Sequence, residues 1–174
     1  ADFAARDEQT SQYKEAANRS NAAPQALQRR LKSDLLLDSL VAETENMQAV
    51  MRRARQVAAS DVPVLIAGEP GTGRATFAKA IHLASGRKSG SFEVVDCRSL
   101  AAPLLVQELA GFAQGAFQGA SRGHVGALAR ANKGTIYFDE ITHLTSEAQG
   151  LLLRAMEEKI VTPLGAEEPA KADI

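Results

Sequence analysis

Several residue types are scarce in this sequence. Its 174 residues include no Trp, and all aromatic residues together make up 5%. The single cysteine, Cys97, excludes a disulfide framework, and with only three His residues, well separated, it argues against a Cys/His metal site. What remains is rich in Ala and Leu, a composition that suits helices packed over an aliphatic sheet.

An excess charge of one sign and long apolar runs are lacking too. The formal net charge is -1, so the chain as a whole exerts no pull on nucleic acid or on an anionic membrane. No apolar run approaches the roughly 20 residues of a membrane span. The opening ADFAARDEQT carries acids where a signal peptide has a basic and then an apolar region. We therefore expect a cytoplasmic protein with no membrane partner.

The amino-terminal part differs in composition from the rest of the chain. Residues 1–38 are polar and Ala-rich, with one narrow apolar stripe through Leu27, Leu31 and Leu35. Such a stripe belongs either to a linker helix that docks on the domain or to a short coiled coil that pairs with its own copy. We expect a helical linker or signalling helix here, followed by one domain over residues 39–174.

Helix-like and strand-like segments alternate beyond that linker. ENMQAVMRRARQVA and ATFAKAIHLAS have helical apolar spacing, and Pro103 can open a helix over PLLVQELAG. VPVLIAG, SFEVVDC and GTIYFDE have the character of strands, the first and third of them buried. This alternation predicts an α/β fold with a largely parallel sheet.

The stretch VLIAGEPGTGRATFAKAIH comes close to a phosphate-binding loop. In the pattern Gly-x-x-x-x-Gly-Lys-[Ser/Thr], glycines let backbone N–H groups curl round a phosphate at a helix N-terminus. A strand-like run leads in and an amphipathic helix leads out, as the pattern requires. The predicted cofactor-binding residues are Gly68, Glu69, Pro70, Gly71, Thr72, Gly73, Arg74 and Ala75.

Two positions of this loop depart from the pattern. Arg74 keeps the charge of the usual Lys, but its flat, forked guanidinium cannot reach between two phosphates as a compact ammonium does. Ala75 replaces the hydroxyl residue that ligates Mg²⁺, which leaves Thr72 or Thr76 as substitutes. We expect nucleotide binding to survive these changes better than hydrolysis. The alternative for Arg74 is a solvated charge with no nucleotide role.

The run IYFDE supplies the acids that a nucleotide site needs. Asp139 and Glu140 follow a strand, and ligands of parallel sheets bind beyond the strand C-termini. Asp139 can hold Mg²⁺ through its hydration shell, and Glu140 is placed to polarise an attacking water. Both are therefore candidate catalytic residues, Asp139 is the candidate metal ligand, and ATP or ADP with Mg²⁺ are the expected cofactors. A structural turn with a capping acid pair is the alternative.

From about Leu40 onward the sequence resembles the AAA+ domain of the bacterial enhancer-binding proteins, the sigma-54-interacting transcriptional activators. The matching stretches keep the family's order and spacing: NMQAVMRRARQVA, VLIAGEPGTGRATFAKAIH, SFEVVDC, LLVQELAGFAQGAFQGA, GTIYFDEI and QGLLLRAMEEKIVTPLG. The resemblance implies a P-loop NTPase fold, a three-layer α/β sandwich, and a role in transcription regulation and signal response. It also implies that residues 39–174 are the N-terminal part of the domain, without its lid and arginine-finger region.

The same resemblance assigns a partner loop. In the family a Gly-Ala-Phe-Thr-Gly-Ala loop grips the sigma factor of RNA polymerase, and it corresponds here to Gly115, Ala116, Phe117, Gln118, Gly119 and Ala120. Gln118 replaces the contact Thr, which puts sigma-54 itself in doubt as the partner. From the residues alone, Phe117 is either a mobile contact tip or a side chain tucked into the core.

Further departures fall on parts that couple hydrolysis to work in the family. Asp96 takes the place of the switch Asn that restrains the catalytic Glu, and its charge would repel that of Glu140. Ala129 replaces a Glu before the third strand. Together with Arg74 and Gln118, these changes favour a domain that binds ATP or ADP with weak or absent hydrolysis.

Two other functions stay open from the sequence. One is an active Mg²⁺-ATPase that remodels sigma-54 RNA polymerase, and the other is an interaction domain that has lost nucleotide altogether. The resemblance further implies self-association to a dimer or a hexameric ring in the full-length protein. DNA contact would come only through a domain outside this sequence.

Overall fold

The computed structural model describes residues 37–40 and 42–174. The linker expected over residues 1–38 therefore lies outside the described residues, apart from Leu37 and Asp38. The helices are η1 (Leu37–Ser39), α2 (Glu45–Ala58), α3 (Arg74–Ala84), α4 (Ala102–Ala110), α5 (Ala127–Arg130), η2 (Ile141–His143) and α6 (Ser146–Glu158). The strands are β1 (Phe92–Asp96), β2 (Gly111–Phe112), β3 (His124–Val125), β4 (Thr135–Asp139), β5 (Ile160–Val161) and β6 (Ala170–Lys171).

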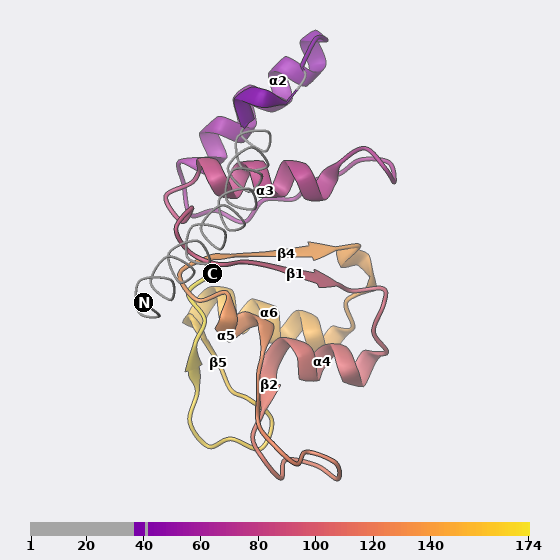
Figure 1. Cartoon of the computed structure of the whole chain (residues 1–174), viewed down its shortest axis with the longest axis vertical. Coiled ribbons are helices and arrows are strands. Elements are labelled where there is room, and N and C mark those ends of the chain that lie inside the picture. Colours follow the sequence, from indigo (N-terminus) through magenta and orange to yellow (C-terminus); the bar gives the residue numbers. More distant parts are fainter. Residues whose placement is uncertain (1–36, 41) are drawn as a thin grey trace, which may run out of the picture.

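A central pair of strands lies between two layers of helices (Figure 1). β1 and β4 are parallel, in register from Phe92 opposite Thr135 to Asp96 opposite Asp139, so both strands end on the same side of the molecule. Helices α2 and α3 lie over one face of this pair, and α4, α5 and α6 lie over the other. The predicted α/β arrangement of helices around a parallel sheet is confirmed.

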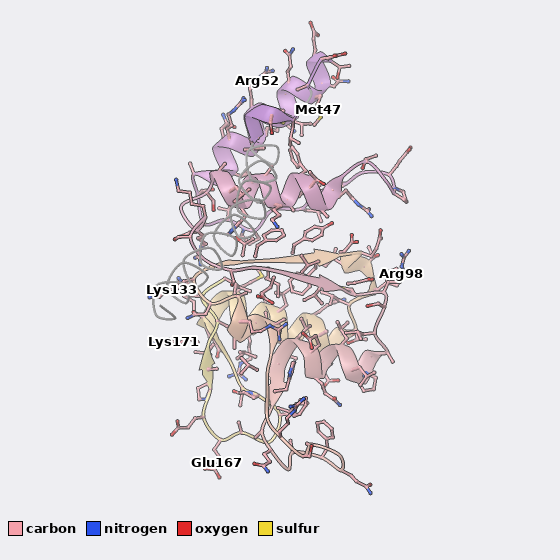
Figure 2. All side chains as sticks on the ribbon, in the orientation of Figure 1. Met47, Arg52, Arg98, Lys133, Glu167 and Lys171 are labelled. Carbon is pink, nitrogen blue, oxygen red and sulfur yellow. The ribbon has the colours of Figure 1, made fainter. Side chains whose placement is uncertain are left out.

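The larger core lies between the strand pair and the layer of α4, α5 and α6. Leu105, Leu109 and Leu128 are the largest fully buried side chains of the described residues, and they belong to a cluster that includes Val95 of β1. Figure 2 shows side chains filling this layer. Pro103 lies in the first turn of α4, as predicted, where its missing N–H leaves no helical hydrogen bond unmade. A smaller cluster joins α2 to α3.

Residues 62–67 do not form the buried strand that the sequence predicts. The segment has no strand partner among the described residues, and Val64 and Leu65 are 43% and 79% exposed. A strand forms only where a neighbour satisfies its backbone N–H and C=O groups. Residues 62–68, β4 and α6 all border one cavity of about 780 Å³. The prediction of a buried strand, made from the apolar composition of this segment, is therefore wrong.

The cavity also changes the environment of β4. The sequence predicts that this strand is buried, yet each of its residues is only partly buried. Among the described residues β4 pairs with β1 alone, so its other edge is unpaired. Near the start of β4, Arg87 donates to Asp61 Oδ1 at 2.9 Å and to Asp173 Oδ1 at 3.0 Å. This arginine ties the segment that leads into residues 62–67 to the last residues of the chain.

Two short antiparallel pairs complete the structure. β2 pairs with β3, and β5 pairs with β6, both on the side of the molecule that carries α4, α5 and α6. Within the described part of the chain, no helix has the length and apolarity to cross a bilayer.

Candidate functional site

The glycine loop has the backbone shape that its sequence predicts. Gly71 and Gly73 have φ angles of 82° and 87°, in the left-handed region that glycine adopts without steric cost. The backbone N and the hydroxyl of Thr72 both donate to the Glu69 carbonyl, at 3.3 and 2.8 Å, and close the turn. Gly73 caps α3 without a side-chain hydrogen bond, so the first N–H groups of this helix keep their capacity to bind an anion.

The predicted acids lie opposite this loop. Figure 1 shows the loop before α3 on the side of the molecule where β1 and β4 end. Asp139 is the last residue of β4, and Glu140 follows with φ 54° and ψ 53°, a left-handed conformation in a residue with a side chain. Such a conformation costs on the order of 1–3 kcal/mol and is common at functional sites. Gly68, Arg74, Asp139 and Glu140 all line the same cavity.

Arg74 connects the loop to the acids. Its Nη1 donates to the Gly68 carbonyl oxygen at 3.1 Å, and its Nη2 donates to the Glu140 carboxylate. The same Nη2 lies 3.8 Å from Asp139 Oδ1. The hydrogen bond to Glu140 raises the pKa of Arg74 further above its ordinary value. The structure thus joins residues of the loop and of the strand end through a contact that sequence reasoning missed.

Tyr137 is a further residue of the site and was not among the predicted site residues. Its hydroxyl donates to Asp139 Oδ1 at 3.0 Å. The pKa of the phenol is raised, mainly by burial and to a smaller extent by this hydrogen bond. Residues two apart in a strand point to the same face, so the spacing in IYFD already carried the signal. The hydrogen bond orients the carboxylate that was predicted to hold Mg²⁺.

The magnesium ligands can be judged from this geometry. No cluster of three or more His, Cys, Asp and Glu side chains that could hold a metal ion occurs between residues 37 and 174 as described. Asp139, with 41% of its side chain exposed, offers a carboxylate that could contribute to Mg²⁺ binding beside phosphate oxygens and water. The residues present therefore fit a metal that arrives with a nucleotide better than one held by the protein alone.

Comparison with known proteins decides the family. The model of the sigma-54 interaction domain matches residues 40–174. The chain belongs to this family. Its relatives include the acetoin dehydrogenase operon transcriptional activator AcoR of Bacillus subtilis, which is 37% identical over 138 residues. The transcriptional regulatory protein GlrR of Escherichia coli is 43% identical over 129 residues.

The matched region is part of longer proteins in these relatives. The alignments cover 79% of this chain but 23% of AcoR, and 74% of this chain but 29% of GlrR. NtrX from Brucella abortus, crystallised in complex with ATP, has a TM-score of 0.71 and 26% sequence identity over 90% of this chain and 33% of its own. NtrX in complex with ADP matches equally well. These neighbours confirm the P-loop NTPase fold of the sigma-54 interaction domain.

The loop that was predicted to contact a partner, residues 115–120, lies at the far end of the molecule from the glycine loop (Figure 1). β2 and β3 hold its base, and Gly115 N donates to Ala120 O at 2.8 Å across it. The Phe117 ring packs edge-on against Phe112 with 5.0 Å between centroids, and Phe117 stays 38% exposed. Phe117 is therefore not tucked into the core, and Gln118 beside it is exposed.

Asp96, the predicted switch residue, makes a local contact in the structure. Asp96 lies opposite Asp139 at the end of the strand pair, and its Oδ1 accepts a hydrogen bond from Arg98 N at 2.9 Å. Figure 2 shows Arg98 at this end of β1. The carboxylate thereby stabilises the turn that follows the strand. An influence of Asp96 on Glu140 stays a prediction.

Proposed function

We propose that this sigma-54 interaction domain binds ATP or ADP, hydrolyses it weakly or not at all, and serves transcription regulation as the nucleotide-responsive part of a longer protein. The observation that carries the proposal is the glycine loop at the N-terminus of α3, with its left-handed Gly71 and Gly73, opposite Asp139 and Glu140. A helix N-terminus without a side-chain capping hydrogen bond and a nearby guanidinium favour an anion of phosphate type.

The contacts of Arg74 support weak hydrolysis. A general base must be free to accept a hydrogen bond from the attacking water. The Glu140 carboxylate instead accepts from Arg74, and this guanidinium replaces the compact ammonium that suits phosphoryl transfer. Asp139 would contribute to holding Mg²⁺, which neutralises phosphate charge when bound.

The same proposal includes partners. We infer that the loop from Gly115 to Ala120 contacts a sigma factor of RNA polymerase, because it presents the exposed Phe117 and Gln118 away from the core. We also infer a cytoplasmic location and self-association in the full-length protein, to a dimer or a hexameric ring. A Gln118→Thr change should strengthen binding to the polymerase only if its sigma factor is sigma-54, which a pull-down with purified holoenzymes would measure.

Nucleotide binding is tested by titrating the 174-residue chain with a fluorescent ATP analogue and with Mg²⁺-ADP. A Gly73→Val change should lower the affinity more than tenfold, because a β-branched side chain is strained at φ 87°. Gly86→Val is the matched control, since a Cβ at Gly86 meets no atom within 4 Å and its φ is not in the left-handed range. Nucleotide affinity of this control should equal that of the wild type.

Three outcomes, of this titration or of a parallel phosphate-release assay, would contradict the proposal. Steady phosphate release from ATP would show an active Mg²⁺-ATPase. No binding at millimolar nucleotide would favour an interaction domain without nucleotide. Equal loss of affinity in both glycine variants would mean that the loop shape is not what binds.

A further inference from the structure

The Arg74 side chain lies folded over the loop from which it starts. One end of its guanidinium donates to the Gly68 carbonyl at 3.1 Å and the other to the Glu140 carboxylate. A Cβ at Gly68 would lie 3.8 Å from Cγ of Arg74, so the stem of the arginine rests on the start of the loop. The side chain therefore bridges the mouth of the loop to the end of β4.

This bridge is better shielded than an ordinary surface ion pair. The side chains of Arg74 and Glu140 are 22% and 25% exposed, whereas those of Arg154 and Glu158, paired on the outer face of α6, are 59% and 46% exposed. Solvent and salt screen a charge pair less as it becomes less exposed. A ligand that needs the Arg74 charge must therefore compete with the Glu140 carboxylate for it.

We propose that the Arg74–Glu140 ion pair is a latch across the phosphate loop, so that Glu140 and the phosphates of a nucleotide compete for one guanidinium. The inference rests on the nucleotide binding proposed above and adds its regulation. Phosphate and Glu140 both draw on the Arg74 guanidinium, so the ion pair lowers nucleotide affinity, and the carboxylate is free only in the fraction of molecules that give up the pair. Arg74 is thus a positioning residue for Glu140.

Removal of the competing charge is the direct test. Glu140→Gln keeps the shape of the side chain but weakens its hold on the guanidinium, so the Kd for ADP should fall roughly tenfold, which corresponds to about 1.4 kcal/mol. The titration uses the 174-residue chain with a fluorescent ADP analogue and EDTA, because a metal ion would make its own use of the carboxylates. Thermal unfolding shows that each variant is folded.

Two control variants separate the latch from weaker explanations. Glu157→Gln removes one negative charge from another residue that lines the same cavity. Asp61→Asn breaks the contact with Arg87 at the opposite end of residues 62–67. Both should bind ADP within about twofold of the wild type. A tenfold gain in either control would overturn the latch, because general charge or general loosening would then explain the result.

A double-mutant cycle with Arg74→Lys gives a second readout. Lys lacks the fork that reaches Gly68 and Glu140 at once, so Glu140→Gln should add little affinity in that background. Equal gains in both backgrounds would overturn the latch. If Glu140→Gln binds ADP with the same affinity as the wild type, the latch is rejected, but the proposed nucleotide binding is not. Absence of binding in every variant rejects nucleotide binding itself, and the latch with it.

Discussion

The two sides of β4 differ sharply. On the packed side, made of β1, α4, α5 and α6, the strand is paired along its whole length and covers a core of fully buried leucines. On the open side, made of residues 62–67, the glycine loop and α3, a cavity of about 780 Å³ takes the place of a paired strand. The difference teaches that one side carries the stability of the fold, while the other carries the candidate site and can move at lower cost.

Truncation of a leucine on each side should give the largest contrast. Leu109→Ala should lower the free energy of unfolding by about 2–5 kcal/mol, because this side chain is fully buried in the packed side. Leu65→Ala, at a side chain 79% exposed, should change it by less than about 0.5 kcal/mol. Urea unfolding followed by circular dichroism measures both. Similar losses in the two variants would refute the comparison.

Thiol labelling should separate the two sides by hundreds-fold in rate. Burial, with smaller effects from Asp96 and Asp139, raises the pKa of Cys97 on the packed side to about 11. Few molecules then carry the reactive thiolate at pH 8. A cysteine placed on the open side by Val64→Cys, at a position 43% exposed, should react at once with a disulfide reagent. Fast labelling of Cys97 in the native wild type would contradict a well-packed side.

The contact between α3 and β4, where the open side meets the strand, should make the stability of the protein depend on pH. His82 of α3 is 4% exposed, and its Nδ1 lies 2.8 Å from Thr135 Oγ1 of β4. Burial, and then the charge of Lys79, lowers the pKa of His82 below its unfolded value of about 6.5. The unfolded chain therefore binds the proton more readily than the folded chain. The contribution of His82 to the free energy of unfolding is complete at pH values above about 6.5 and is lost as the pH falls below it.

Substitution of His82 tests this sign. His82→Asn retains a polar atom for Thr135 but does not titrate, so its stability should fall less between pH 7 and pH 5 than that of the wild type. His143→Asn, at an exposed histidine, is the matched control and should keep the wild-type slope. If stability falls equally with pH in His82→Asn and in the wild type, the contact between α3 and β4 does not depend on the protonation of His82.

Local patterns of the sequence foretold the glycine loop and the acids at the end of β4, because residue type and short spacing encode both. Burial of residues 62–67 could not be foretold, since it depends on a neighbouring strand and not on the apolar run itself. The contact between Arg74 and Glu140 spans 66 residues of sequence, and nothing in the local spacing marks it. The role of Tyr137 could have been predicted from the sequence, because a residue two positions before Asp139 lies on the same face of the strand.

The open side is tied at both ends by an arginine. Arg87 reaches Asp61 and Asp173 near the start of β4, and Arg74 reaches Gly68 and Glu140 at its end. A sheet fixes the spacing of its strands with a ladder of hydrogen bonds, whereas among the described residues no such ladder joins residues 62–67 to β4, and an arginine contact borders the gap at each end. Because Asp61 is 74% exposed, salt screens its contact with Arg87 more than it screens the shielded pair of Arg74 and Glu140, so raised ionic strength should loosen the Arg87 end of residues 62–67 first.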